Sequence, residues 1–117
     1  PVATTAHAAS GETQAVCGRL SEIATALAKE MPIKLDDFTT QTAIEADCAT
    51  KTFSFAKKAN GTSADFPDGW QKLLQEQWGY LMCGKIAFSE AIETGWEVSE
   101  TISFADGTKH RSVAVCK

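Results

Sequence analysis

Residues 96–115 read Trp-Glu-Val-Ser-Glu-Thr-Ile-Ser-Phe-Ala-Asp-Gly-Thr-Lys-His-Arg-Ser-Val-Ala-Val, and this stretch decides the fold. From Trp96 to Phe104 every second residue is apolar, apart from Glu100, and the residues between them are polar. This period of two is typical of a half-buried strand. Asp106-Gly107 has the composition of a type I′ turn, after which Val113 and Val115 form a second apolar row. The stretch therefore predicts an antiparallel β-hairpin.

A two-residue turn at Asp106-Gly107 also fixes the pairing of this hairpin. Ile102 is then predicted to lie opposite Arg111, and Glu100 opposite Val113, which brings Glu100 diagonally close to Arg111. An ion pair on the surface of a strand is usually only weakly stabilising. We therefore interpret this pair as a structural contact rather than a functional site.

A second hairpin is predicted earlier in the chain. Thr42, Ile44 and Ala46 occupy alternate positions, and Phe53 and Phe55 do the same after a turn near residues 48–49. The two phenylalanines are predicted to be core residues. Residues 57–68 contain several Gly, Asn, Asp and Pro residues and are predicted to form a surface loop.

Helices are predicted before and after the hairpin that contains Thr42 to Phe55. Apolar residues recur at helical spacing within residues 10–30, and Pro32 ends this helix. A second helix is predicted from Trp70 to Leu81, capped by Asp68, with its tryptophans and leucines on one stripe. A further helix is predicted over residues 86–94, before Gly95.

The element order indicates an α+β fold. Helix, two strands, helices and two strands predict an antiparallel sheet of two hairpins with helices packed on one face. This sequence of elements is also compatible with an internal pseudo-repeat, in which two similar units follow each other. Residues 10–117 are predicted to form one domain. Residues 1–9 contain Ala6-His7-Ala8 and are interpreted as a signal-peptide remnant or a disordered terminal segment.

Four cysteines, Cys17, Cys48, Cys83 and Cys116, are spread through the 117 residues. They lack the short spacings of thiol-redox or zinc motifs and are best explained as two disulfides in an exported protein. Three pairings are open to four cysteines. The phrases Cys-Gly-Arg-Leu and Cys-Gly-Lys-Ile begin at Cys17 and Cys83, so we favour the pairs Cys17 with Cys48 and Cys83 with Cys116.

Composition narrows the class of partner. The net charge of −4 is spread along the chain, which argues against nucleic acid or an anionic membrane as the main partner. No apolar run approaches the roughly 20 residues of a transmembrane helix. We expect no cofactor, because the sequence contains no nucleotide-binding or metal-binding motif.

The stretch from Leu27 to Thr40 reads Leu-Ala-Lys-Glu-Met-Pro-Ile-Lys-Leu-Asp-Asp-Phe-Thr-Thr. It resembles small exported bacterial proteins of uncharacterised function, in which a helix ends in Pro-x-Lys-x-Asp-x-x-Thr and is followed by a hairpin, a Cys-containing helix and a final hairpin ending in Cys. The resemblance covers Leu27 to Cys116. It implies a periplasmic or secreted α+β protein and implies no activity.

The sequence favours a non-catalytic module that binds another protein, either an envelope assembly factor or an inhibitor or immunity-type protein. Such a module needs a rigid scaffold and an exposed patch. The partner's identity and the oligomeric state stay open. The candidate contact residues lie in the predicted turns and in the loop before the second helix: Asp36, Asp37, Asn60, Asp65, Phe66 and Trp70. Core packing is the alternative interpretation for Trp70, Trp78 and Trp96.

Two other function classes are weighed beside the binding module. One is a carrier of a small apolar ligand, with a pocket between helices and sheet lined by Trp78, Tyr80, Phe53 and Phe55. The other is a small hydrolase, for which the acid and base candidates are Glu93, Glu97, Glu100 and Asp65. No recognisable motif connects any two of these carboxylates, so we expect no enzymatic activity.

Overall fold

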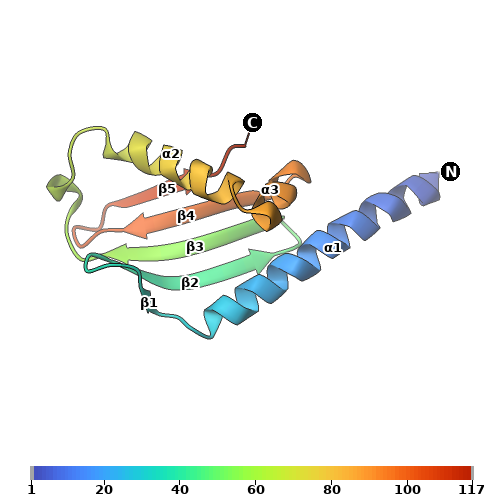
Figure 1. Cartoon of the computed structure of the whole chain (residues 1–117), viewed down its shortest axis with the longest axis horizontal. Coiled ribbons are helices and arrows are strands. Elements are labelled where there is room, and N and C mark those ends of the chain that lie inside the picture. Colours follow the sequence, from blue (N-terminus) through green and yellow to red (C-terminus); the bar gives the residue numbers. More distant parts are fainter. Residues whose placement is uncertain (1, 117) are drawn as a thin grey trace.

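The computed structural model describes residues 2–116 of the chain, with side chains described from Gln14 onward. Three helices and five strands form two layers (Figure 1). In chain order they are α1 (Val2–Ala28), β1 (Ile33–Lys34), β2 (Thr39–Asp47), β3 (Thr52–Ala59), the 3₁₀ turn η1 (Ser63–Asp65), α2 (Trp70–Cys83), α3 (Ile86–Glu93), β4 (Glu97–Ser103) and β5 (Lys109–Val113). The α+β class predicted from the sequence is confirmed.

The five strands lie in the order β1-β2-β3-β4-β5. Pairing is antiparallel within each hairpin, as predicted, but β3 and β4 pair in parallel, for example at Phe53 and Val98. The prediction of a wholly antiparallel sheet is therefore wrong for the β3–β4 pair. The reason is the connection: β3 and β4 are linked through α2 and α3, and parallel neighbours require such a crossover.

The predicted pairing of the final hairpin is wrong by one residue. Glu100 lies opposite Ser112, and Ile102 lies opposite His110. The turn contains three residues instead of two, because the Phe104 N–H donates to the Thr108 carbonyl at 2.8 Å and Gly107 adopts a φ of 86°. A glycine in this left-handed conformation is typical of a three-residue hairpin loop. The shift places Glu100 and Arg111 on opposite faces of the sheet.

Several predicted element boundaries also change. Strand β3 continues to Ala59, so the predicted loop over residues 57–68 begins later. Gly69, at a φ of 84°, is the residue before α2, and Asp68 does not cap that helix. Helix α1 begins at Val2. The interpretation of residues 1–9 as a signal remnant or disordered segment stays a prediction, and their side chains lie outside the described part of the chain.

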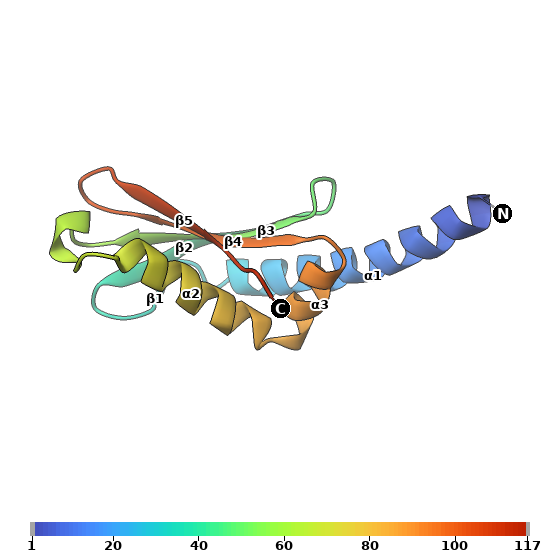
Figure 2. The same ribbon diagram turned by 90° about the horizontal axis from the view of Figure 1, so that it is seen from above.

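All three helices cover the same face of the sheet (Figure 2). Helix α1 packs along β2, α2 packs along β5 and β4, and α3 contacts both of the longer helices at one end. An Arg19–Glu90 ion pair also joins α1 to α3. The main core lies beneath this junction and consists of Val16, Leu20, Ala24, Ile44, Phe53, Phe55, Trp78, Met82, Phe88, Ala91, Trp96, Val98 and Ala114.

A second, smaller apolar cluster lies at the other end of the sheet. It is made of Ala59, Trp70, Ile102 and Phe104, against which Phe38, Phe66 and Leu74 pack. Buried polar residues lie on the helix-facing side between the two clusters: Gln41, Glu100 and Ser112, next to the half-buried Lys57. The sheet under α2 is therefore apolar at both ends and polar in the middle.

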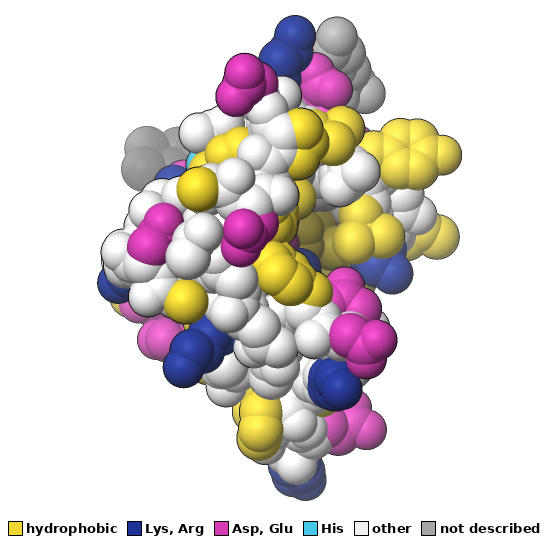
Figure 3. All heavy atoms as spheres, turned by 90° about the vertical axis from the view of Figure 1, so that its left-hand side faces the viewer, with side chains coloured by type: hydrophobic (Ala, Val, Ile, Leu, Met, Phe, Trp, Pro, Cys, Tyr) yellow, Lys and Arg dark blue, Asp and Glu magenta, His cyan; other side chains and the backbone are white. Residues whose placement is uncertain are grey.

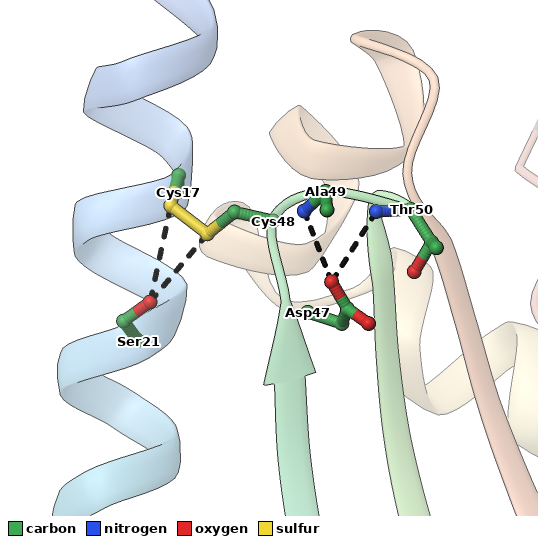
Figure 4. Close-up of a disulfide and its surroundings, with 6 residues drawn as sticks. All are labelled: Cys17, Ser21, Asp47, Cys48, Ala49 and Thr50. Atoms are coloured by element: carbon green, nitrogen blue, oxygen red, sulfur yellow. Dashed lines mark hydrogen bonds between the residues drawn. A yellow bond between two sulfur atoms is a disulfide. The ribbon is translucent and has the colours of Figure 1, made fainter.

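Both predicted disulfides are present. Cys17 pairs with Cys48 and Cys83 with Cys116, each with a Cα–Cα distance of 5.6 Å. The first joins α1 to the β2–β3 turn, with the Ser21 hydroxyl 3.9 and 3.7 Å from the two sulfurs (Figure 4). The second joins the end of α2 to the residues after β5. Because one bridge reaches a hairpin turn and the other the end of a hairpin, the similar separations of 31 and 33 residues do not mark equivalent units of a repeat.

Candidate binding cleft

The residues predicted as a contact surface come together at one end of the molecule, where the β1–β2 loop meets the segment between β3 and α2 (Figure 1). The Asn60 Nδ2 donates to the Asp37 carbonyl at 3.1 Å. The Phe66 ring lies 5.4 Å from Phe38 and 5.6 Å from Trp70, measured between ring centroids. Residues up to 34 positions apart in the sequence therefore share one region.

Most polar groups in this region hold the local backbone. The Asp36 carboxylate accepts from the N–H groups of Phe38 at 2.8 Å and Thr39 at 2.6 Å, and these bonds hold the pKa of Asp36 below its usual value. Asp65 accepts from the Thr62 N–H at 3.0 Å. Asp37 is fully exposed, and its contact is an ion pair with Lys34 at 3.4 Å.

The tip of the β4–β5 hairpin is fastened to the same region. Asp106 accepts from the Thr108 N–H at 3.0 Å and from the Ser63 hydroxyl at 2.9 Å. The Thr108 bond is the main reason that the pKa of Asp106 is lowered. The hairpin tip and η1 therefore form one rigid end of the domain.

Trp70 lies below the surface of this end. Its side chain packs edge-on against Phe66, Phe104 and His110, with ring centroids 5.1–5.6 Å apart. Trp78 and Trp96 are also buried. All three tryptophans are thus core residues, as in the alternative interpretation of the sequence, and Trp70 supports the contact region from beneath.

A cleft of about 200 Å³ opens beside this region, between α2 and the β1–β2 loop. Figure 3 shows hydrophobic side chains gathered around a hollow on this side of the molecule. We call it the binding cleft. One wall is formed by Leu35, Asp36 and Thr39, the other by Leu74, Gln77, Trp78 and Leu81, and the floor by Lys57, Glu100 and Ile102.

An ion pair lies on the floor of the binding cleft. The Lys57 Nζ is 2.7 Å from the Glu100 Oε1, and only 14% and 5% of the two side chains are exposed. The same ammonium lies 5.0 Å from the centroid of the Trp78 ring, a cation–π distance. Trp78 is fixed in turn, because its Nε1 donates to the Val98 carbonyl at 3.1 Å.

The outer side of α2 continues the apolar wall into solvent. Leu73 and Leu81 are each 50% exposed, Tyr80 is 88% exposed, and Leu35 across the cleft is 47% exposed. The sheet-facing side of α2 is held separately: the Gln75 side-chain amide donates to the Val113 carbonyl and accepts from the Val113 N–H at 2.9 Å. Helix α2 therefore presents apolar side chains both to the sheet and to the cleft.

The pocket predicted for a small-ligand carrier is not formed by the four residues proposed for it. Phe53, Phe55 and Trp78 pack directly on one another, with centroid distances of 5.2 Å and 5.1 Å. Tyr80 points away into solvent. The binding cleft is also smaller than the roughly 300–1,000 Å³ typical of small-molecule sites.

The candidate acids of a hydrolase do not converge either. Glu100 pairs with Lys57, whereas Glu97 pairs with Arg111 at 2.8 Å on the opposite face of the sheet. Within the described residues, no group of three or more His, Cys, Asp or Glu side chains is placed to hold a metal ion. No helix in that part of the chain is long and apolar enough to cross a membrane.

Three solved structures share this fold. A protein from Pseudomonas aeruginosa described as a candidate secreted protein is 9% identical, with a TM-score of 0.67 over 86% of this chain and 90% of the other. EpsS, a type 2 secretion system pilotin from Vibrio vulnificus, is 16% identical, with a TM-score of 0.64 over 90% and 94%. The type II secretion system pilotin AspS from Vibrio cholerae is 13% identical, with a TM-score of 0.59 over 92% and 91%.

At these identities the likeness establishes the fold. The matches span 86–92% of this chain and 90–94% of the others, so the likeness concerns the fold as a whole. No protein-family model matches the sequence, and the comparison with curated proteins finds no match.

Proposed function

We propose that this protein is an exported, non-catalytic accessory factor of the cell envelope, and that it binds an apolar segment of a partner protein in the binding cleft. The observation that carries the proposal is the exposed apolar side of α2 facing Leu35 across the cleft. Exposed apolar surface that is rimmed by polar residues is typical of protein-interaction sites.

The exposed leucines on and beside the cleft supply part of the free energy of binding. Leu35, Leu73 and Leu81 are each about half exposed. Covering the exposed half of a leucine contributes about 1 kcal/mol, so these three side chains supply about 3 kcal/mol to the association. Tyr80 adds a large aromatic side chain of the kind enriched in binding hot spots.

The scaffold supports the same interpretation. Two disulfides fasten α1 and α2 to the sheet, and the second, at the end of α2, helps to hold the helix that forms one wall of the binding cleft. Disulfides of this kind are typical of proteins that function outside the cytoplasm. The likeness of the fold to two pilotins of type II secretion systems favours an envelope assembly factor over an inhibitor or immunity-type protein.

The proposal is tested by comparing one substitution in the cleft with one outside it. Leu81→Asp places a charge on the cleft wall, whereas Ile86→Asp changes a residue that is 77% exposed and does not line the cleft. The tagged, oxidised proteins are incubated with the solubilised native envelope fraction, and bound proteins are quantified by mass spectrometry.

We expect one stoichiometric partner to be retained by the unchanged protein and by Ile86→Asp, and at least tenfold less by Leu81→Asp. Circular dichroism and thermal unfolding confirm that both variants are folded. Retention of the same partner by all three proteins contradicts a role for the cleft. If no protein is retained above a reduced and unfolded control, the binding module itself is refuted.

A further inference from the structure

The binding cleft is too small for a helix or strand to sink into it as a whole. Its volume of about 200 Å³ matches one or two amino-acid side chains. A partner segment must therefore lie across the rim, on the exposed leucines, and insert individual side chains between the walls. The chemistry of the lining then decides which side chain is accepted.

The positive and negative side chains that line the cleft do not balance one another. Lys57 is neutralised by Glu100, to which it is paired at 2.7 Å, and its ammonium is further engaged by the Trp78 ring. Asp36 has no cationic side chain within salt-bridge distance among the described residues. The nearby Lys34, whose charge helps the backbone hydrogen bonds to lower the pKa of Asp36, is itself paired with Asp37 at 3.4 Å. The lining of the cleft therefore carries a net charge of about −1 at neutral pH.

Asp36 is fixed in position for an interaction. Two backbone N–H groups hold its Oδ1, so the loop and the carboxylate form one unit. These bonds also favour the ionised carboxylate, since they lower the pKa of Asp36. The Asp36 side chain thus presents a permanent negative charge beside the apolar side chain of Leu35.

We propose that the binding cleft selects a partner segment with an arginine or lysine among its apolar residues. The methylene stem of this side chain passes between Leu35 and Leu81, and its cationic head pairs with Asp36. Long basic side chains bury an apolar stem while their charge reaches a polar partner, which fits walls of leucine with a carboxylate on the rim. The Gln77 side chain on the opposite wall offers a further oxygen acceptor.

An acidic side chain is disfavoured at the same place. It would meet the negative charges of Asp36 and Glu100, and the one cation of the lining, Lys57, is already paired. Like charges brought together at an interface oppose binding and give specificity. This inference rests on the proposed function, because it names the chemistry of the segment that the cleft holds.

Three designed peptides test the inference. Each is a helix of about 18 residues, or five turns, with a leucine face, a neutral polar face and no tryptophan. They differ at one position on the border of the leucine face, which is Arg, Gln or Glu. Binding to the oxidised protein is measured by calorimetry and by the fluorescence of the protein's tryptophans, at low salt and in 0.5 M NaCl.

We expect the Arg peptide to bind about tenfold more tightly than the Glu peptide, with the Gln peptide between them. The difference should shrink in 0.5 M NaCl, since salt screens exposed charges. Asp36→Asn should remove most of the preference, because the amide oxygen still accepts the two backbone bonds while the charge is lost. Asp68→Asn is the matched control, since Asp68 is exposed, lies outside the cleft lining and makes no ion pair among the described residues, and it should leave the preference unchanged.

The outcomes separate this inference from the proposed function. Equal binding of the three peptides, or tighter binding of the Glu peptide, overturns the charge preference and leaves the apolar cleft intact. Loss of the preference in Asp68→Asn and not in Asp36→Asn overturns the assignment to Asp36. If none of the peptides binds, the apolar cleft fails as a peptide site and the proposed function fails with it.

Discussion

Removal of the disulfide between Cys17 and Cys48 tests how α1 is held on the sheet. This bridge is the covalent link between α1 and the β2–β3 turn, and the helix otherwise packs on β2 and α3 through side chains such as Val16 and Leu20. The double substitution Cys17→Ala with Cys48→Ala removes the bridge and keeps the apolar contacts. The equivalent change at Cys83 and Cys116 provides a matched control.

The expected magnitude follows from the lengths of the two loops. The bridges join residues separated by 31 and 33 positions. In the chain-entropy relation each loss costs about 4 kcal/mol of unfolding free energy, and the two costs differ by less than about 0.1 kcal/mol. A domain of this size has a total stability of about 5–15 kcal/mol. Each single-bridge variant should therefore fold with reduced stability, and removal of both bridges should leave the chain largely unfolded.

Urea unfolding followed by circular dichroism and tryptophan fluorescence measures these losses. We expect equal decreases in the two single-bridge variants and a steeper dependence on urea, because the unfolded chain without a cross-link exposes more surface. A loss below about 1 kcal/mol in both variants would refute the loop-entropy reasoning. A loss much larger for one bridge would show that native-state contacts, and not loop closure, dominate its contribution.

Two further substitution sets probe the floor and the rim of the cleft region. Lys57→Met or Glu100→Met alone should lower the free energy of unfolding by about 2–4 kcal/mol, since each leaves the other charge poorly hydrated and unpaired. The double variant should lie within about 1 kcal/mol of the unchanged protein in urea unfolding. Losses that simply add in the double variant would contradict this coupling. Gly61→Ala should lower the stability by about 1–3 kcal/mol, because a Cβ atom there would lie 2.7 Å from a ring carbon of Phe38. Gly18→Ala in α1 meets no such contact and should raise the stability by about 0.5–1 kcal/mol. Both are measured by thermal unfolding, and equal effects of the two substitutions would refute the steric argument.

The fold was predictable to the extent that it depends on local patterns. The alternation around Ile44, Phe53 and Val98 predicted strands that the structure contains, and the similar four-residue phrases at Cys17 and Cys83 led to the pairing that it shows. The parallel pairing of β3 with β4 was not predictable in this way. It depends on how the α2–α3 crossover packs, and period-two alternation is the same for parallel and antiparallel neighbours.

The floor of the cleft was missed because of two local errors. A two-residue turn was expected at Asp106-Gly107, which put Arg111 on the same face as Glu100, whereas with the three-residue turn Glu100 lies opposite Ser112 and Arg111 lies on the other face. Lys57 was assigned to a loop, although it is still within β3. The register error gave Glu100 the wrong neighbour on β5, and the loop assignment left Lys57, its partner in the structure, without a predicted place on the sheet.

The outer wall of the cleft was visible in the sequence but was interpreted as core. Successive residues of a helix are rotated by about 100°, so the apolar arc of α2 from Tyr80 through Leu73, Leu81 and Trp78 to Met82 covers about 200° of its circumference. A helix that rests on a sheet with one side uses a stripe of little more than about 100°. The arc is therefore wider than the sheet alone covers, and in the structure its outer part, with Tyr80 and Leu73, is exposed to solvent beside the binding cleft, next to Leu81 of the cleft wall. Under the proposed function a partner segment would cover this part of the arc, and the width of the arc, rather than the presence of any one residue, would then be the sequence signal for binding.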